Sequence, residues 1–208
     1  MSKLILTYPL LCLITDPEVP DLVTRIEVAL SAGVNMVQLR GHTLPAAELY
    51  RLALIIRPLC QHYGAIFIVN DRIDVGLATG ADGFQLGTHS LPLAAARQLI
   101  GEDYLLGVSV HTCEEALTAR AGGADFLLAG TIFASQTHPD ESPNGPDLLY
   151  AIKQTLPTCP LLAIGGITET NARQAMQAGA NGIAVISAIL GSANVKQAVN
   201  ELYMAINP

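Results

Sequence analysis

The chain alternates between short apolar runs and longer stretches in which apolar residues recur at helical spacing. The runs are nearly continuous rather than alternating with polar residues, which is typical of parallel strands buried on both faces. They read LLCLITD, MVQLR, IFIVND, GFQLG, LLGVSV, DFLLAG, PLLAIGG and GIAVIS. A helix candidate follows each run, so the pattern predicts eight strand and helix pairs.

Four segments share one signature: a glycine, a small or apolar residue, an Asp or Asn, and then an apolar run. They occupy residues 33–39, 80–86, 123–128 and 179–186. Each glycine follows a helical stretch and suits the left-handed residue that ends a helix. Because the signature precedes every second strand, it predicts quarter-symmetry. This favours a single-domain α/β fold, the (β/α)8 TIM barrel, over the alternative of an open, doubly wound sheet.

The composition limits the class of protein. The chain has 208 residues, of which 50% are hydrophobic and 14% charged, so residues 1–208 predict one ordered globular domain. A net charge of −7 disfavours a phosphate backbone or an anionic membrane as a partner. We therefore expect no nucleic-acid partner and no membrane partner, and homo-oligomers stay possible.

The cysteines Cys12, Cys60, Cys113 and Cys159 are scattered and show no zinc or disulfide spacing. They predict buried free thiols in a reducing cytoplasm. The apolar run LILTYPLLCLIT near the N-terminus lacks a cleavage site of the AxA type, so a secretion signal is not favoured and a cytoplasmic location is expected.

In such a barrel the chemistry lies on the loops that follow the carboxyl ends of the strands. The sequence is polar there, at Thr15, Asp16, Gln38, Arg40, residues 70–72 and 88–90, Ser109, His111 and residues 131–138. Arg40 could bind an anion or form a salt bridge to Asp71 or Glu48. Asn70 and Asp71 could orient a substrate amide edge and hold a hard cation, or Asp71 could cap the following helix.

The last two strands end in Gly165, Gly166 and Ser187. A glycine pair lets the backbone approach a ligand closely, and N–H groups at a helix start can bind phosphate. We therefore expect a phosphate site here. The alternative is that the glycines only relieve crowding at the strand end.

Five histidines are present, and only His62 falls on a helix candidate. The others, in the mouth loops, are His42, His89, His111 and His138. Together they could supply general acid and base capacity near neutral pH, or they could simply be solvated. The polar loop QTHPDESPNGPD is either an active-site lid or an exposed connector.

Several segments, in this order, resemble the thiamine phosphate synthase/TenI family over nearly the whole chain. They are CLITD, VQLR, VNDRIDVGLATGADGFQLG, GVSVHTCEEA, GADFLLAGTIF, AIGGIT and AGANGIAVISAI. The resemblance implies a TIM barrel and a place in thiamine biosynthesis. There the synthase joins a hydroxymethylpyrimidine diphosphate to a hydroxyethylthiazole phosphate and releases pyrophosphate.

The resemblance also implies roles for individual residues. On the thiazole phosphate side, Gly166, Ile186 and Ser187 match the phosphate binders of the family, and Ser135 and Thr137 match its hydroxyl pair. The pyrimidine side is implied to consist of Gln38, Arg40, Asn70 and Ser109.

The diphosphate and metal side departs from the family pattern. The synthase expects two magnesium-binding Asp residues and two Lys residues. Asp71 remains, Ser90 takes the position of the second Asp, and His42 and His138 take the lysine positions. We therefore expect only weak metal binding, at Asp71.

A diphosphate leaving group needs its charge neutralised, so these losses favour a TenI-like thiazole tautomerase, which needs a base but no diphosphate machinery and no cofactor. The catalytic His of the tautomerase corresponds to Thr131 here, so His138 is the expected base, with Arg40 and Ser109 as further catalytic candidates. Two alternatives stay open: an active synthase that uses Mg²⁺, and a noncatalytic regulator that binds thiazole or thiamine phosphates. All three take a small-molecule phosphate as ligand.

Overall fold

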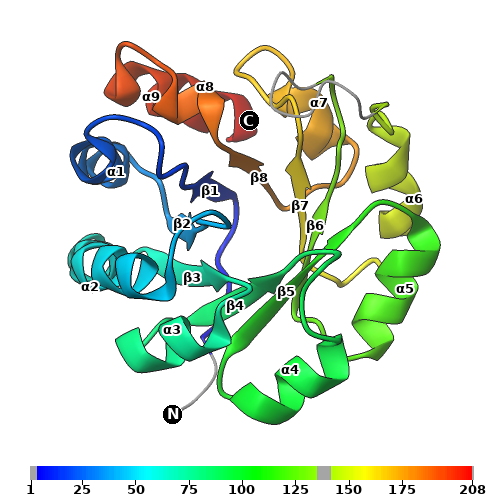
Figure 1. Cartoon of the computed structure of the whole chain (residues 1–208). Helices are drawn as coiled ribbons and strands as arrows, with labels where there is room; N and C mark the ends of the chain where they lie inside the picture. The colour runs from blue at the N-terminus through cyan, green and yellow to red at the C-terminus, as the bar shows by residue number, and fades with distance from the viewer. Residues whose placement is uncertain (1–3, 135–141, 208) are drawn as a thin grey trace.

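The computed structural model describes residues 4–134 and 142–207, and its eight parallel strands close into a barrel. The strands follow one another in chain order, and β8 pairs with β1 (Figure 1). This closure confirms the predicted (β/α)8 barrel and excludes the open sheet, in which two edge strands would each lack a neighbour on one side.

Each predicted apolar run contains one strand. The strands are β1 Leu10–Ile14, β2 Met36–Leu39, β3 Ile66–Asn70, β4 Gly83–Leu86, β5 Leu105–Val110, β6 Phe126–Ala129, β7 Leu161–Ile164 and β8 Gly182–Val185. The helices are α1 Leu22–Ser31, α2 Ala46–Tyr63, α3 Ile73–Thr79, α4 Leu93–Ile100, α5 Cys113–Ala121, α6 Asp147–Thr155, α7 Ala172–Gln177, α8 Ser187–Leu190 and α9 Val195–Ile206. The described chain thus has one helix more than predicted, because the short α8 precedes α9 after β8.

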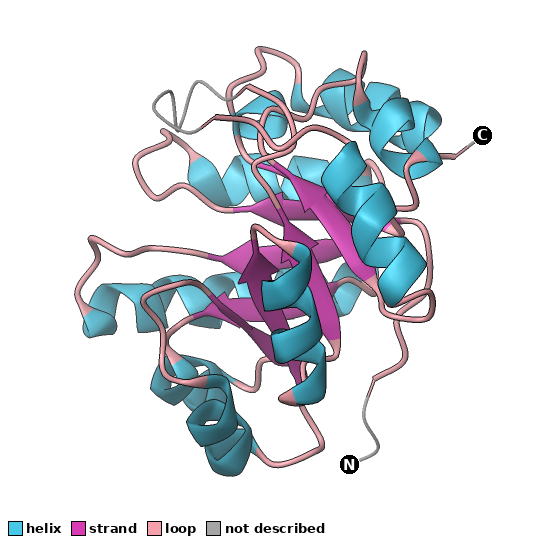
Figure 2. Cartoon of the chain, turned by 90° about the vertical axis from the view of Figure 1, so that its right-hand side faces the viewer, coloured by secondary structure: helices cyan, strands magenta, loops and turns pink. Residues whose placement is uncertain are grey.

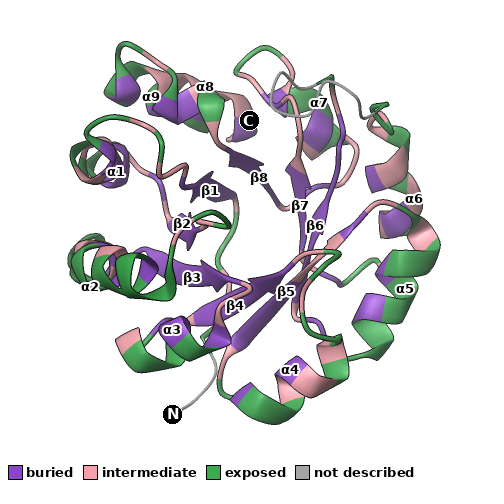
Figure 3. Cartoon of the chain, in the orientation of Figure 1, coloured by how far each residue is buried: buried purple, intermediate pink, exposed green. Residues whose placement is uncertain are grey.

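The strands are buried on both faces, as their continuous apolar runs predict (Figure 3). One apolar cluster fills the barrel interior and includes Cys12, Met36, Ile68 and Phe126. A second cluster, between the strands and the surrounding helices, includes residues such as Phe67. The helices surround the barrel (Figure 1) and cover the outside of its strands (Figure 2), and none of those described is both long and apolar enough to cross a membrane.

The repeated Asn or Asp joins neighbouring strands at the amino-terminal end of the barrel. Each side-chain oxygen accepts the backbone N–H of a residue at the start of an odd-numbered strand: Asn35 from Leu11 (2.8 Å), Asp82 from Phe67 (2.8 Å), Asp125 from Leu106 (2.9 Å) and Asn181 from Leu161 (3.1 Å). In every case the backbone N–H of the Asn or Asp donates back to the carbonyl of the same strand residue. The quarter-symmetry predicted from the sequence therefore corresponds to four equivalent pairs of hydrogen bonds between neighbouring strands. We call each pair, with its Asn or Asp, a clamp.

The two acidic clamps each have a cationic partner. Arg57 of α2 lies 2.8 Å from the Asp82 carboxylate, and Arg97 of α4 lies 2.7 Å from that of Asp125. A half-buried carboxylate needs such compensation, whereas the neutral amide of an Asn does not. The four signature glycines before the clamps all have positive φ, as expected of residues that end helices.

All four cysteines are free thiols. Cys12, Cys60 and Cys159 are buried, as predicted, but Cys113 at the start of α5 is only half-buried. Burial raises the pKa of the Cys12 thiol to about 12 and that of Cys60 likewise to about 12. A thiol that stays protonated is a poor nucleophile and metal ligand, so these groups are structural.

Candidate active site

A cavity of about 670 Å³ opens at the carboxyl ends of the strands, where the sequence predicts the site. One side of it is polar and is formed by Gln38, Arg40, His42, Asn70, Ser109 and His111, from the ends of β2, β3 and β5. The other side is mainly backbone and small or apolar side chains, from Gly165, Gly166, Ile186, Ser187 and Ala188 at the ends of β7 and β8. The cavity therefore has two sides of different chemistry.

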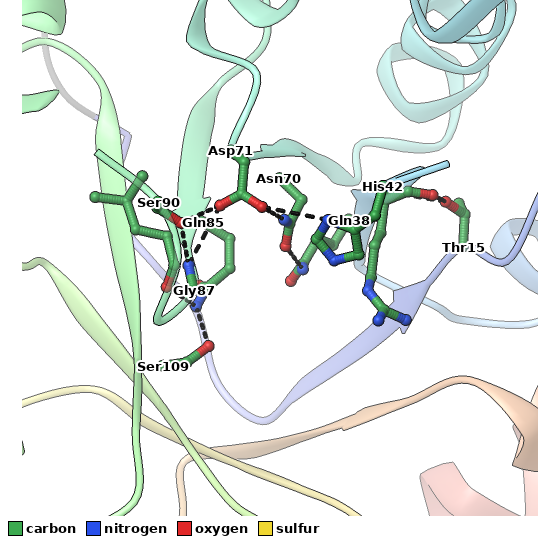
Figure 4. A network of polar contacts seen from close by, with 11 residues as sticks. Thr15, Gln38, His42, Asn70, Asp71, Gln85, Gly87, Ser90 and Ser109 are labelled. Carbon is green, nitrogen blue, oxygen red and sulfur yellow. Dashed lines mark hydrogen bonds and ion pairs between the residues drawn. The ribbon is translucent and has the colours of Figure 1, made fainter. Parts of the chain in front are cut away.

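A chain of hydrogen bonds fixes the amides of the polar side (Figure 4). The amide of Asn70 donates through Nδ2 to Asp71 Oδ2 at 2.5 Å, and that of Gln38 donates through Nε2 to Asn70 Oδ1 at 2.7 Å. An ionised carboxylate can only accept hydrogen bonds, so Asp71 determines which end of each amide faces which neighbour. As a result, Gln38 keeps its carbonyl Oε1 as an acceptor for a ligand.

Asp71 connects three loops. Its φ of 57° is left-handed, and its Oδ1 accepts the N–H of Gly87 at 3.3 Å and the hydroxyl of Ser90. His42 Nδ1 lies 3.5 Å from Asp71 Oδ2. The α3 helix follows Arg72 without a side-chain cap. The alternative that Asp71 caps this helix is therefore wrong, since its side chain turns to the β4 loop instead.

Arg40 is held by its backbone. The Thr15 hydroxyl donates to the Arg40 carbonyl at 3.0 Å, and the Arg40 N–H donates to Thr15 Oγ1 at 2.9 Å. Among the described residues its guanidinium forms no salt bridge to Asp71 or Glu48. That alternative is wrong, because His42 is the residue that lies against Asp71, and the guanidinium at the cavity is left able to bind an anion.

The glycine pair has a packing role that can be seen directly. The φ values of Gly165 and Gly166 are 94° and 62°. A Cβ on Gly165 would lie 2.5 Å from the side chain of Thr131, and one on Gly166 would collide with the carbonyl of Ala134. The glycines therefore let the loop after β6 cross the end of β7, as the crowding alternative predicts. They also leave bare backbone in the cavity wall.

The short α8 begins at Ser187, beside this backbone. The first N–H groups of a helix have no intrahelical partner. Gly166, Ile186 and Ser187, which the family resemblance implies are phosphate binders, all line the cavity.

Of two further residues at or beside the cavity, His111 is one of the predicted mouth-loop histidines, whereas Gln85 is not predicted from the sequence. His111 lines the cavity and contacts the carbonyl oxygen of Gly130 through Nδ1 at 2.7 Å. Because a carbonyl oxygen only accepts, Nδ1 carries the hydrogen, and in the neutral imidazole the lone pair is on Nε2. The position after β5 signals His111 in the sequence. Gln85 of β4 contacts Ser109 (Figure 4). In the sequence, the only indication of this residue is that a polar side chain interrupts an apolar run.

Three predicted site residues, Ser135, Thr137 and His138, lie outside the described residues. Within residues 4–134 and 142–207 there is no cluster of three or more His, Cys, Asp or Glu side chains suited to a metal. Asp71 thus has a hydroxyl (Ser90) and an imidazole (His42) beside it rather than a second carboxylate.

A family model described as thiamine monophosphate synthase matches residues 11–189. The chain belongs to this family. It is 45% identical over 192 residues to the thiamine-phosphate synthase of Methanospirillum hungatei JF-1, with 90% of this chain and 93% of the relative covered. It is 40% identical over 192 residues to that of Pyrococcus furiosus, with 92% of each covered.

Comparison with solved structures supports the same family. The thiamine phosphate pyrophosphorylase from Pyrococcus furiosus superimposes with a TM-score of 0.89 at 38% identity, and 95% of each chain is covered. A 3-hexulose-6-phosphate synthase at 20% identity, with a TM-score of 0.72, shares the fold alone. The chain is an enzyme of the thiamine monophosphate synthase family and acts in thiamine biosynthesis, as the sequence resemblance implies.

Proposed function

We propose that this enzyme is a thiamine phosphate synthase, which joins hydroxymethylpyrimidine diphosphate to hydroxyethylthiazole phosphate and releases pyrophosphate. The observation that carries the proposal is the two-sided cavity. A synthase must hold two substrates of different chemistry, whereas a tautomerase holds one. The names of relatives that are 40 to 45% identical also support it.

The polar side suits an aminopyrimidine. Gln38 offers an acceptor for an exocyclic amine, and the hydroxyl of Ser109 can donate to a ring nitrogen. Since the Asp71 and Asn70 side chains fix the Gln38 amide, the acceptor is in place before the ligand arrives. Such preorganisation lowers the entropy cost of binding.

The diphosphate of this substrate would extend towards Arg40 and His42. Mg²⁺ often binds through one or two carboxylates together with substrate phosphates, and in this chain Asp71 and the Ser90 hydroxyl are hard oxygen ligands held against each other. These two residues therefore fit an ion that arrives with the diphosphate. When bound, Mg²⁺ would neutralise charge on the leaving group.

The glycine side would hold the thiazole phosphate, with the phosphate against the backbone of Gly166 and Ser187 and the ring near Ile186. From the resemblance, Ser135, Thr137 and His138 would complete this side. The thiazole nitrogen then forms a bond to the pyrimidine methylene carbon, and the carbon–oxygen bond breaks, with its electron pair leaving on pyrophosphate. The residues of the two sides would hold both substrates so that these atoms lie close together, and this proximity lowers the barrier to bond formation.

The tautomerase, which the departures on the diphosphate side favour in the sequence, has less support. Its expected base position holds Thr131, which is buried and has no basic side chain. Should an isomerase activity be present, His111 is the described residue to test as base, since its Nδ1 contacts the Gly130 carbonyl and the neutral imidazole would carry its lone pair on Nε2, at a residue that lines the cavity.

The test is one assay of both reactions with purified protein, with and without Mg²⁺. We expect thiamine phosphate to form only when both substrates and Mg²⁺ are present. Aromatisation of the thiazole phosphate carboxylate without thiamine phosphate formation would contradict the proposal and support the tautomerase. Tight binding of thiazole phosphate or thiamine phosphate without either reaction would contradict both enzyme functions and support the noncatalytic regulator.

A further inference from the structure

Gln85 of β4 lies inside the barrel beside Ser109 of β5 and is 1% exposed. Its Nε2 donates to Ser109 Oγ at 3.1 Å and to the carbonyl of Leu86 at 3.3 Å (Figure 4). Ser109 lines the cavity, whereas the polar side described above does not include Gln85. The contact therefore links the polar side to a residue behind it.

The Leu86 carbonyl fixes the orientation of the Gln85 amide, and Gly107 gives the amide its space. A flipped amide would turn Oε1 towards the carbonyl of Leu86 and bring two acceptors together. Gly107, its register partner on β5, supplies the space, since a Cβ there would collide with Gln85 Oε1. The donor end of the amide therefore faces Ser109.

Gln85 Oε1 is buried and has no hydrogen-bond partner within the described part of the chain. A buried carbonyl without a partner is costly, and an apolar side chain of the same length would avoid that cost. Packing alone therefore does not account for a glutamine here. What the glutamine adds is the N–H directed at Ser109.

That N–H fixes the polarity of Ser109. An amide nitrogen cannot accept a hydrogen bond, so the Ser109 oxygen must accept from Gln85. The hydroxyl hydrogen then points elsewhere, and none of the hydrogen bonds described for the chain uses it. It can be donated into the cavity.

We infer that Gln85 is a positioning residue of the pyrimidine side, which holds the Ser109 hydroxyl as a donor towards a ring nitrogen of the substrate. The inference rests on the proposed synthase function. It adds a residue behind the cavity that selects a heteroaromatic acceptor over a carbon at the same ring position.

The experiment compares Gln85→Met, Ser109→Ala and the double variant with the wild type. We expect Gln85→Met to raise the KM for the pyrimidine diphosphate about three- to tenfold, as for one lost hydrogen bond, and to leave the KM for the thiazole phosphate unchanged. Because Gln85 acts through Ser109, the double variant should bind no more weakly than Ser109→Ala. Additive losses, or equal shifts in both KM values, would overturn the inference.

Phe126→Leu is the matched control. Phe126 is also buried and packs at Gly107, so this variant disturbs the same packing without removing the amide. It should lower the melting temperature without changing the ratio of the two KM values. If it changes that ratio as Gln85→Met does, packing explains the effect and the inference fails.

Calorimetric titration with the pyrimidine diphosphate alone separates this inference from the proposed function. If the wild type binds it but forms no product, the synthase proposal fails, while the difference between wild type and Gln85→Met still tests Gln85. If Gln85→Met binds it as tightly as the wild type, the inference fails and the synthase proposal is unaffected. Analogues with each ring nitrogen replaced by CH should include one that the wild type binds weakly and that Gln85→Met binds equally weakly.

Discussion

The carboxylate of Asp82 accepts the backbone N–H of Phe67 at 2.8 Å, across the amino-terminal ends of β3 and β4. The same carboxylate lies 2.8 Å from Arg57 of α2, so it joins two strands and a helix. The clamp lies at the opposite end of the barrel from the cavity. A substitution at this clamp should therefore lower the stability of the protein without lowering its activity.

Asp82→Ala should destabilise the protein by about 2–4 kcal/mol, because it leaves both the Phe67 N–H and the Arg57 guanidinium without their acceptor. Asp82→Asn should cost less, since its amide oxygen can still accept from Phe67. Urea denaturation measures both. Asp74→Ala is the control, because the Arg72–Asp74 pair is exposed and should contribute less than about 1 kcal/mol. Equal losses for Asp74→Ala and Asp82→Ala would contradict the clamp.

Gly166→Asp should lower thiazole phosphate affinity by about tenfold or more, since it adds bulk and negative charge where the phosphate is proposed to bind. The measurement is a titration with thiazole phosphate. Gly64→Ala is a matched control: its φ of 69° is similarly left-handed, but an added Cβ there meets nothing within 4 Å. If Gly166→Asp binds the ligand as Gly64→Ala does, the phosphate lies elsewhere.

Magnesium dependence tests the diphosphate side. We expect weak binding of Mg²⁺ to the free protein, with little heat at millimolar concentration, because within residues 4–134 and 142–207 Asp71 has no second carboxylate beside it to complete a metal site. Ser90→Asp places a second carboxylate against Asp71 and should lower the Mg²⁺ concentration for half-maximal turnover about tenfold.

Ser90→Ala and Asp71→Asn complete that series. Ser90→Ala removes one of the two proposed oxygen ligands but keeps the carboxylate of Asp71, so the Mg²⁺ concentration for half-maximal turnover should rise. Asp71→Asn should reduce turnover at least about 100-fold. Submillimolar Mg²⁺ binding by the free wild type that Asp71→Asn abolishes would show a stronger metal site than we expect.

The buried thiols predict a loss of stability at alkaline pH. The folded-state pKa of Cys12 and of Cys60 is raised to about 12 from an ordinary value of 9.0. Below pH 9 both states keep these protons, and above it only the unfolded state releases them. Unfolding free energy should therefore fall by about 1.4 kcal/mol per pH unit for each thiol.

Denaturation curves between pH 8 and 10.5 measure this slope. Cys12→Ala should reduce the slope by the contribution of one thiol. An unchanged slope in Cys12→Ala would refute the assignment. In the native protein, a thiol reagent should modify the half-buried Cys113 first, and Cys12 and Cys60 only on unfolding.

The local pattern of the sequence determined the strands, the barrel and the end of the barrel that carries the site. Continuous apolar runs and helical spacing are local properties, so they identify the strands without knowledge of their neighbours. The repeated glycine and Asn or Asp added the symmetry. Gln38, Arg40 and Asn70 could be assigned to the cavity because every strand points the same way in such a barrel.

Only the tertiary structure decided which groups contact one another. Asp71 lies against His42 and Ser90 rather than capping α3, and Gln85 reaches Ser109 from the next strand. These contacts join side chains that are 19 to 29 positions apart, and no local periodicity encodes them. The orientation of each amide depends on the donor or acceptor that barrel closure places beside it, so the polarity of the pyrimidine side is a property of the closed barrel.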